Sequence, residues 1–474
     1  MTAIDNFVLA ISNILYQPFI VPLILIGGAI YLTFRCGFLQ IGMFKEACKV
    51  ITEKPHEGGI SSFGALMVST ASRVGTGNII GVSTAIVCGG PGAICWMWVT
   101  AFFGGASAFV ESTLAQIYKK NDGEGGSIGG PAFYMRDALG QKWLGVIFSI
   151  LIIFTYMVGY NMLAAYNLQS TFAAFSWYKE GSTPFVIGII LCVLFGVIVL
   201  GGAKRLINVT EILVPVMGVM YVIVSLIVLA INIPNIGHMF GMIFSSAFDF
   251  SAIFGGFAGS CIMYGVKRGL YSNEAGMGSA PNAAARADVS HPAKQGLVQM
   301  LSVFIDTLLI CSATAFMCLS TKVDPNAYNL ADGPNAAGYV QDSLASVFGG
   351  FGPAFIAIAM CFFAFTTLIG NYSYCEGCYE FIIGREGTKT ELLIMRVIAA
   401  ILVLLGSIAS AGLVWDIADM MQGLMVITNV PSIIILGGIA FKCLDDYKRQ
   451  MAQGINPLFK AADIGLKQKT DFWN

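Results

Sequence analysis

Small polar residues and glycines interrupt an apolar stretch of the chain near residue 75. Residues 74–78 read VGTGN, follow Arg73 directly and lie in the middle of the apolar residues 61–88. Glycine disfavours a helix, and at bilayer depth a backbone freed from helical hydrogen bonds is tolerated only where it lines a cavity or is buried in protein. Freed carbonyl oxygens bind cations, and the free amides of a helix N-terminus attract carboxylates. Taken alone, such a cluster is better explained by a close contact between two helices.

The composition indicates a membrane protein. Of 474 residues, 56% are apolar and 11% are charged, whereas a soluble domain has about 25% charged residues. The net charge of -1 gives no positive field that would bind nucleic acid. Most of the 12 cysteines lie in apolar stretches, and the pair Cys375 and Cys378 is better explained by one helical turn than by zinc. We therefore expect a polytopic membrane protein without a cofactor, a structural metal or a nucleic-acid partner.

Eleven apolar stretches can each form a helix of about 20 residues, the length that crosses a bilayer. They cover approximately residues 17–34, 61–88, 92–118, 143–172, 184–203, 209–232, 251–270, 295–321, 353–383, 392–411 and 415–441. No separate soluble domain fits between them. The sequence therefore predicts a single all-α transmembrane domain over residues 1–474, with residues 442–474 as a cytoplasmic tail.

The glycine-rich interruption occurs twice. Residues 255–260 read GGFAGS and repeat the feature in the seventh stretch. When residues 17–60 are set aside as an extra N-terminal helix and its connection, the other ten stretches form two sets of five, 61–232 and 251–441, each beginning with an interrupted stretch. Because five is odd, the two sets start on opposite sides of the membrane. This arrangement is typical of transporters with inverted repeats and discontinuous helices, and it favours a binding site over simple helix packing.

The positions of Lys and Arg indicate the orientation, because cytoplasmic loops retain positive charge. With the N-terminus outside, 23 of the 26 basic residues fall on the cytoplasmic side, and only Lys179 and Lys322 fall on the other. The cytoplasmic group includes Lys267 and Arg268, which are expected in the loop after the seventh span, whereas Asp419 is expected near the outer surface. The sequence therefore predicts an outside N-terminus and a cytoplasmic C-terminus.

Several motifs resemble those of the alanine or glycine:cation symporter family. The most specific is SNEAGMGSAPNAAA at residues 272–285. Shorter matches are GGPGAICWMWVTAFFGG at 89–105 followed by Glu111, GGPAFYM at 129–135, VGTGN at 74–78, FIDTLLIC at 304–311 and FAFTTLIGNY at 363–372. The resemblance runs from about residue 30 to about residue 440. It implies a sodium-coupled amino-acid transporter of the cytoplasmic membrane with the five-plus-five inverted-repeat fold of leucine-transporter-like (APC) proteins and one extra N-terminal helix.

The resemblance also implies roles for individual residues. The substrate-binding residues would be Thr76, Gly77, Asn78, Phe257, Gly259, Ala164 and Asn371. Sodium would be bound by hydroxyls of Thr366 and Thr367, opposite backbone carbonyls near Ser72 and Gly75. Neutral hydroxyl and carbonyl oxygens suit a hard cation. Without the resemblance, a pair of adjacent threonines would be better explained by helix packing with back-bonding to the chain.

Two positions differ from the family pattern. Ala164 stands where many members have Gln, and Asn371 stands where some have Trp. Both differences place a smaller side chain near the expected pocket. The family implies alanine or glycine as the substrate. Because smaller side chains leave more room in the pocket, glutamine is the larger, more polar alternative.

Four ionisable residues are predicted at bilayer depth, where a central charge costs about 2.5–3.5 kcal/mol. They are Arg73, Glu111, Glu211 and Asp306. We expect Arg73 to pair with Glu111 or Asp306 as part of a cytoplasmic gate. The alternatives are that Arg73 binds the substrate carboxylate, and that Asp306 relays a proton, which would make a proton the coupling ion.

Two other classes of protein fit the sequence less well. A channel would need a short filter sequence or a ring of charges, and no such repeat is present. An intramembrane enzyme would need a motif such as HExxH or GxSxG, and the sequence contains neither. The sequence therefore favours a secondary transporter over a channel and predicts no enzymatic activity.

Overall fold

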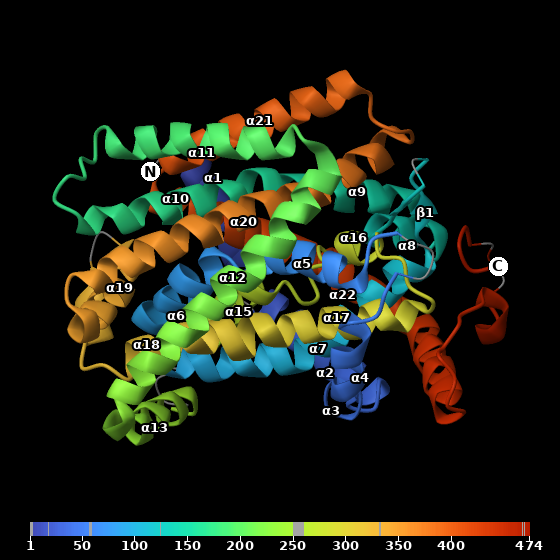
Figure 1. The fold of residues 1–474 in the computed structure, drawn as a ribbon, viewed down its shortest axis with the longest axis horizontal. Helices are drawn as coiled ribbons and strands as arrows, with labels where there is room; N and C mark the ends of the chain where they lie inside the picture. The colour runs from blue at the N-terminus through green and yellow to red at the C-terminus, as the bar shows by residue number, and fades with distance from the viewer. Residues whose placement is uncertain are drawn as a thin grey trace.

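A computed structural model gives the three-dimensional structure. It describes residues 3–17, 19–55, 59–123, 125–249, 260–330, 333–466, 468 and 470–474. The long helices lie side by side, and most of them run along the long axis of the molecule (Figure 1). The strands in the described residues form two short antiparallel hairpins. They are β1 (Lys120–Asn121) with β2 (Ser127–Ile128), and β3 (Asn329–Leu330) with β4 (Gly333–Pro334).

Seven segments of the described chain are long and apolar enough to cross a membrane. They are α7 (Gly92–Ile117), Lys142–Ala174, most of α12 (Gly202–Ile231), Pro292–Leu319, α20 (Phe351–Ile383), α21 (Lys389–Ser407) and α22 (Ala411–Ala452). The pair α1 (Ala3–Tyr16) and α2 (Ile20–Arg35), bent by 41°, would add an eighth. The prediction of a polytopic all-α membrane protein is confirmed.

Three further predicted spans correspond to shorter helices. They are α5 (Ser62–Arg73) with η1 (Gly77–Gly81) and α6 (Val82–Gly89) in the second span, α11 (Thr183–Val199) in the fifth, and α15 (Cys261–Asn273) in the described part of the seventh. The number of eleven spans and the division into two inverted repeats therefore stay predictions.

Two of the long segments contain a π-helical turn. The first consists of α9 (Lys142–Ile153), η2 (Phe154–Tyr160) and α10 (Asn161–Ser170). The second consists of α17 (Pro292–Phe304), η6 (Ile305–Cys311) and α18 (Ser312–Leu319). Such turns widen a helix locally and are frequent at functional sites. Both therefore mark places where a side chain is set out of the regular helical register.

Short helices connect the long ones. They are α3 (Leu39–Gly42), α4 (Phe44–Ile51), α8 (Pro131–Asp137), η3 (Thr171–Ala174), η4 (Ile233–Asn235), α13 (Ile236–Ala247), α16 (Pro281–Ala284), η7 (Pro325–Tyr328), α19 (Ala336–Phe348) and η8 (Ala461–Ile464). Among these, α13 and α19 are helices of 12 and 13 residues that the sequence analysis left between its spans.

Burial separates the inner helices from the peripheral ones. Every residue of α17 and most residues of α7 are buried, and these two helices pack against each other. In contrast, α11, α12 and α21 expose many Val, Leu and Ile side chains. A helix that is apolar all round and still exposed is stable in lipid rather than in water. The peripheral helices therefore form the lipid-facing surface.

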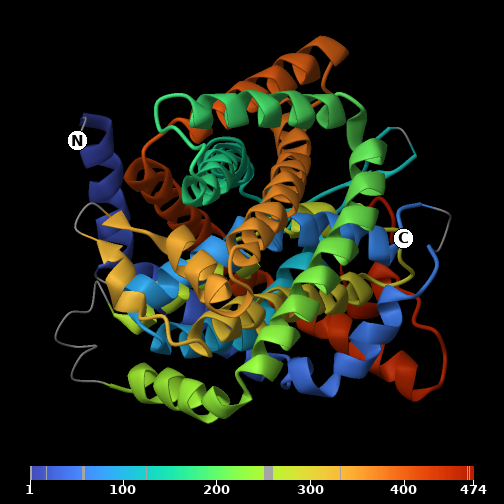
Figure 2. The same ribbon diagram turned by 60° about the vertical axis from the view of Figure 1, so that its left-hand side comes forward.

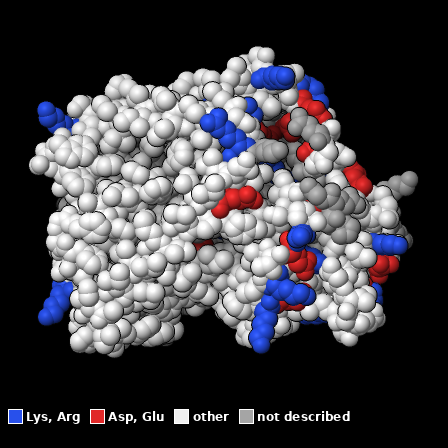
Figure 3. Space-filling view, in the orientation of Figure 1, with Lys and Arg blue, Asp and Glu red and all other residues white. Residues whose placement is uncertain are grey.

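Charged side chains gather at one end of the molecule. In Figure 3 they lie mainly at the end that carries α4, α8 and the C-terminus, and most of the remaining visible surface is uncharged. The segments at this end belong to the side on which the sequence analysis places most Lys and Arg residues. An uncharged band beside a charged end is the surface expected of a chain that crosses a bilayer.

The two ends of the chain differ from the prediction. The helix α1 lies at the edge of the bundle and packs against α22 (Figure 2), whereas the predicted first span began at residue 17. The helix α22 continues to Ala452, into the predicted tail. The rest of the tail folds back, and the Trp473 Nε1–H group donates to the carbonyl oxygen of Gln116 at the end of α7 at 2.7 Å.

Candidate functional site

The predicted interruption of the second span is present. Helix α5 ends at Arg73, Val74 and Gly75 are not helical, and η1 begins at Gly77. A Cβ atom built on Gly75 would overlap Oγ1 of Thr367, so any larger residue would force the Thr367 side chain to move. The last carbonyl groups of α5 lack the continuing helix that would bond them. Thr367 of α20 therefore lies directly against the broken end of α5.

Helix α20 approaches the end of α5 unusually closely. A Cβ atom built on Gly370 would lie 2.4 Å from the backbone nitrogen of Ser72. The Asn371 side chain meets Ser72 one residue further on, with the two side-chain oxygens 2.7 Å apart. Asn371 Nδ2 also donates to Asn161 Oδ1 on α10 at 2.9 Å. Gly370 thus allows the polar side of α20 to reach the break.

Asn78 connects the two sides of the break to a buried acid. Its Oδ1 accepts from the Gly75 amide at 2.7 Å, and its Nδ2 donates to Asp306 Oδ1 at 2.7 Å. The hydroxyl of Thr314 donates to the Asn78 carbonyl at 2.6 Å. The side chain of Asn78 is fully buried. It therefore fixes the geometry of the break rather than pointing freely into a cavity.

Asp306 lies in the π-helical turn η6 and is fully buried. Its other oxygen, Oδ2, accepts from the hydroxyls of Ser272 and Thr307, both at 2.8 Å. With Asn78, three neutral donors therefore hold this carboxylate. Both oxygens of this buried acid thus have hydrogen-bond partners.

Aromatic side chains cover the other side of the break. Tyr271 OH lies 3.0 Å from Oγ1 of Thr76, and a Cβ atom on Gly77 would lie 2.9 Å from the Tyr271 ring. The Tyr271 ring makes edge contacts with Tyr160 at 4.8 Å and with Trp415 at 5.3 Å between centroids. The hydroxyl and ring of Tyr271 therefore close directly over the expected substrate-binding residues.

Glu274 is a buried acid that the sequence analysis did not single out. It follows α15 in a left-handed conformation (φ 57°) and is fully buried. Hydroxyls of Ser72 and Ser279 donate to its two oxygens at 2.7 and 2.8 Å. The carboxylate therefore sits beside the last turn of α5. The chain after it, with positive φ at Gly276 and Gly278, is a second buried break.

The ion pair of Arg73 differs from the predicted one. Within the described residues, the carboxylate nearest its guanidinium is that of Glu274, at 4.0 Å, rather than that of Glu111 or Asp306. Its Nη1 donates to Gln299 Oε1 at 3.0 Å. The correction has a simple cause, because Glu274 belongs to a segment that the sequence analysis placed beyond the seventh span.

Glu111 lies in a separate hydrogen-bond network. Its Oε2 accepts from Asn429 Nδ2 at 2.8 Å, and Tyr134 OH donates to Asn429 Oδ1 at 2.5 Å. The side chain is fully buried, and its Oε1 has no hydrogen-bond partner in the described part of the chain. Glu111 is thus a buried acid of α7 whose direct neighbour is Asn429.

The prediction that Lys267 and Arg268 lie in a charged loop is wrong. Arg268 Nη2 donates to both carboxylate oxygens of Asp419, at 2.9 and 2.7 Å, and Lys267 lies 3.2 Å from the same carboxylate. The guanidinium of Arg268 also stacks on the Trp415 ring at 4.2 Å. Asp419 is 4% exposed and not solvated as expected. These charges are held within the bundle because Lys267 and Arg268 lie inside α15, which packs against α22.

The remaining predicted residues are only partly brought together. Phe257 and Gly259 lie outside the described residues, as does the predicted break at 255–259. Ala164 is buried on α10. The hydroxyl of Thr366 bonds the α20 backbone and contacts Met217 on α12 at 3.4 Å. Of the two adjacent threonines, Thr367 is therefore the one in contact with the break.

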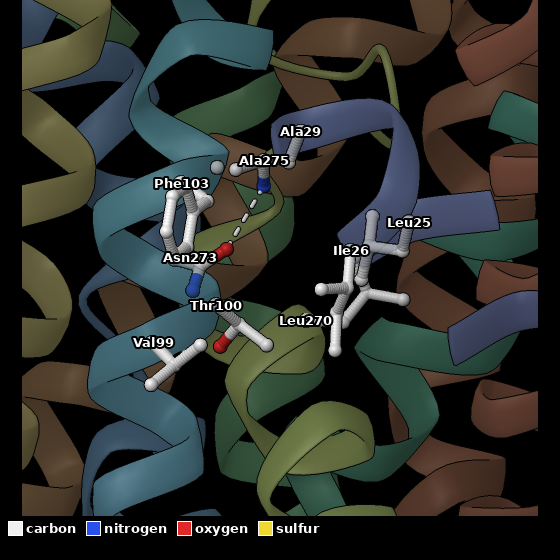
Figure 4. A pocket seen from close by; sticks show the side chains of 10 residues that line it. Leu25, Ile26, Ala29, Val99, Thr100, Phe103, Leu270, Asn273 and Ala275 are labelled. Carbon is white, nitrogen blue, oxygen red and sulfur yellow. Dashed lines mark hydrogen bonds between the residues drawn. The ribbon is translucent and has the colours of Figure 1, made fainter. Parts of the chain in front are cut away.

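A small cavity lies beside the second break, between α2, α7 and the end of α15 (Figure 4). Its volume is about 10 Å3, about that of one water molecule. Leu25, Phe103 and Leu270 line it together with Asn273, whose Oδ1 accepts from the amide of Ala275 at 3.0 Å. The cavity cannot hold an amino acid. It shows instead that α2 packs against the segment carrying Glu274.

Tyr271 and Glu274 are the contacts that the sequence analysis missed. Glu274 lies inside the motif SNEAGMGSAPNAAA, and the two glycines that follow it signal an irregular backbone. Tyr271 directly precedes the same motif. If this motif had been interpreted as an interruption inside the bundle rather than as a loop, both residues would have been expected at the site.

The fold and the site together define a class of protein. A multi-pass bundle contains a broken helix whose two ends meet hydroxyls, amides and buried acids, which is the construction of secondary transporters. The chain belongs to the sodium:alanine symporter family, whose profile matches residues 1–461. It is therefore a transporter and not an enzyme.

Relatives match the chain over nearly its whole length. The amino-acid carrier protein AlsT of Bacillus subtilis is 44% identical over 95% of this chain and 94% of its own. The "Probable sodium/glutamine symporter GlnT" of the same organism is 41% identical over 97% and 94%. The sodium/alanine symporter AgcS of Methanococcus maripaludis is 38% identical over 92% and 95%. All three support the family assignment.

Proposed function

We propose that this protein is a symporter that uses sodium to carry a small neutral amino acid inward across the cytoplasmic membrane by alternating access. The observation that carries the proposal is the break at residues 74–76, where α5 ends against Thr367 and η1 begins beside Tyr271. The names of the relatives, which include a sodium/alanine symporter, support sodium as the coupling ion. The motif resemblance supports the inverted repeats 61–232 and 251–441 around this break.

The substrate would bind at the start of η1. The amides of Thr76 and Gly77 lie at the N-terminal end of the helical residues 77–89, which favours a carboxylate, whereas the Asn78 amide donates to the Gly75 carbonyl at 3.1 Å. The ring of Tyr271 would cover the bound amino acid. A ligand of this kind is a zwitterion, so the opposite end of the break must receive its ammonium group or the cation.

The sodium ion would bind at the end of α5. Thr367 Oγ1 and the carbonyl groups of Ser72 and Gly75 are neutral oxygens of the kind that a hard cation prefers. The C-terminal end of α5 carries the negative end of the helix dipole, which adds to the attraction. The hydroxyl of Thr366 contacts Met217, so we assign the hydroxyl ligand to Thr367 alone.

The candidate substrates are the small amino acids alanine and glycine, and the larger amino acid glutamine. Polar amide groups support glutamine, because Asn161 Nδ2 and Asn167 Oδ1 have no hydrogen-bond partner in the described residues. Asn167 also reaches Thr76 at 3.3 Å. A substrate with an amide side chain could satisfy both orphaned atoms, whereas alanine would leave them unpaired.

The orientation follows from the charged end of the molecule. We infer that this end faces the cytoplasm, with the N-terminus outside and the C-terminus inside, because basic residues are retained on the cytoplasmic side. Arg73 with Glu274 would then form part of the barrier between the binding site and the cytoplasm. A C-terminal reporter domain that is active only outside the cell would contradict this orientation.

A proton is the second candidate for the coupling ion. Asp306 favours it, because a buried carboxylate in contact with Asn78 could gain or lose a proton as the break rearranges. The two candidates predict different driving forces. Sodium coupling requires a sodium gradient, whereas proton coupling would let uptake follow a pH gradient without sodium.

The test is uptake into proteoliposomes that contain the purified chain. Labelled alanine, glycine and glutamine are offered with an inward sodium gradient, with an inward proton gradient and with neither. We expect accumulation only with sodium, and exchange of labelled for unlabelled substrate when no gradient is present. Uptake driven by the proton gradient alone would replace sodium by the proton, and flux without exchange would indicate a channel.

A further inference from the structure

An apolar groove runs along the outside of the bundle beside the broken helix. It has a volume of about 400 Å3 and is formed by α5, α12 and η6, with Ile51 at the end of α4 closing one end. This volume lies within the range of about 300–1,000 Å3 for small-molecule sites. Apart from Thr70, every residue that lines it is apolar. A ligand of this groove must therefore be a hydrocarbon.

The groove has a buried floor and an exposed rim. Leu66, Val74 and Val214 in the floor are at most 4% exposed. Val219 and Leu309 on the rim are 60% and 48% exposed. An open apolar channel between helices would be unfavourable in water but can be filled by a lipid chain within a bilayer. The groove is thus shaped to hold a chain that lies along α12.

The sequence of α12 creates the space. Pro215 and Gly218 line the groove, and a Cβ atom on Gly218 would find only Ile310 Cδ1 within 4 Å, at 3.9 Å. A larger side chain at this position would therefore enter the groove without striking the backbone. The lining residues of α12 extend from Val214 to Ile223, a distance of about 13 Å along the helix.

Basic residues lie close along the chain to two residues that line the groove, Ile51 and Val214. Ile51 is followed three residues later by the exposed Lys54, and Arg205 is exposed on α12 about 13 Å before Val214. An acid is also present, since Glu211 Oε1 would lie 2.7 Å from a Cβ atom on Gly64. A phosphate group suits the two cations, and an adjacent amine would suit Glu211. The end of the groove therefore matches a phospholipid headgroup.

The geometry points to a specific binding site for one phospholipid, whose acyl chain fills this groove and whose phosphate lies near Lys54 and Arg205. In the orientation proposed above, this lipid belongs to the cytoplasmic leaflet. Its chain contacts Val74 in the break of the second span and Ile305 and Leu309 in η6, which also carries Asp306. The lipid therefore touches both elements that surround the substrate site.

Native mass spectrometry of the full chain tests this site. The protein is purified in detergent with added phosphatidylethanolamine and phosphatidylglycerol, and retained phospholipid is counted without sodium or substrate, so the result does not depend on transport. Gly218→Leu fills the groove. Gly196→Leu is the matched control, because a Cβ atom on this glycine of α11 would meet nothing within 4 Å.

We expect the unaltered chain and Gly196→Leu to retain one phospholipid each. Gly218→Leu should lower the affinity at least about tenfold, which corresponds to about 1.4 kcal/mol. The double variant Lys54→Gln with Arg205→Gln should weaken binding while leaving the groove intact. Equal lipid retention by Gly218→Leu and the unaltered chain would overturn the proposal. Detection of a dimer that carries no phospholipid would also overturn it, because a second copy would then cover the groove.

Discussion

The bundle contains two buried groups of charges that are built in different ways. In the central group, two acids, Glu274 and Asp306, accompany the single cation Arg73, and most of their hydrogen bonds come from neutral hydroxyl and amide groups. In the outer group, Lys267 and Arg268 both contact the single acid Asp419 at 3.2 Å or less.

This difference indicates different roles for the two groups. The outer group stabilises the packing of two helices, and the central group surrounds the proposed binding site. The outer charges contact one another directly across two helices, so they hold α15 against α22. The central acids outnumber their cation and are held mainly by neutral donors, so ion pairing alone does not fix the groups around the break. The outer group should therefore matter mainly for stability and the central group mainly for transport.

Asp419→Asn should give the largest effect on stability. It leaves Arg268, which is 3% exposed, without its counter-ion, and removal of one partner from a buried pair costs about 3–5 kcal/mol. Thermal unfolding in detergent measures this loss, with the exposed Asp445→Asn on the same helix as the control. An unchanged unfolding temperature would show that the outer group does not stabilise the packing of the two helices.

Asn78→Ala should lower sodium-dependent uptake about a hundredfold. It removes the donor to Asp306 and the acceptor for the Gly75 amide, and two such bonds in a buried site are worth about 3 kcal/mol together. Its unfolding temperature should fall less than that of Asp419→Asn. Uptake assays with Asn326→Ala, at an exposed position, give the control. Near-normal uptake by Asn78→Ala would remove this residue from the site.

Gly75→Ala should cost about 1–3 kcal/mol of stability, because the added methyl group collides with Thr367. Thr367→Ala in the same chain removes the hydroxyl and should restore part of the lost stability, but not the transport. Gly412→Ala, where a Cβ atom meets nothing within 4 Å, is the control. If Gly75→Ala unfolds like the unaltered chain, α20 does not press on the break.

Tyr271→Phe should give the smallest effect. It keeps the ring over Gly77 but loses the hydroxyl contact with Thr76, so the KM for the amino acid should rise about fivefold, or about 1 kcal/mol. Uptake as a function of substrate concentration measures this change. A larger loss in Tyr271→Ala is expected because the ring is removed as well. Identical KM values for Tyr271→Phe and the unaltered chain would place the substrate elsewhere.

The sequence was informative where a feature is local. The break at Gly75 could be predicted because glycines and small polar residues at bilayer depth disfavour a helix whatever surrounds them. The all-α class followed from the length and apolarity of the stretches. The short helix α11 was harder to delimit because apolar residues continue past its end, and α15 was harder because it continues through the charged residues Lys267 and Arg268.

Contacts between distant segments could not be predicted in the same way. Glu274 reaches Arg73 only because α15 ends at Asn273, and Arg268 reaches Asp419 because α15 lies beside α22. The sequence analysis assigned Lys and Arg residues to the loops between its spans. It therefore placed Lys267 and Arg268 of α15 in a cytoplasmic loop, whereas both lie against Asp419 within the bundle. Thr366 and Thr367 are one residue apart and so point about 100° apart on a helix, and the sequence does not say which one faces the break.

The most direct test of the central claim compares sodium affinity in Thr366→Ala and Thr367→Ala. The sodium concentration that gives half-maximal amino-acid uptake is measured for both variants and for the unaltered chain. The account predicts at least about a tenfold increase for Thr367→Ala, equivalent to about 1.4 kcal/mol, and little change for Thr366→Ala. Unchanged sodium affinity in Thr367→Ala, or a larger effect in Thr366→Ala, would contradict the cation site at the break.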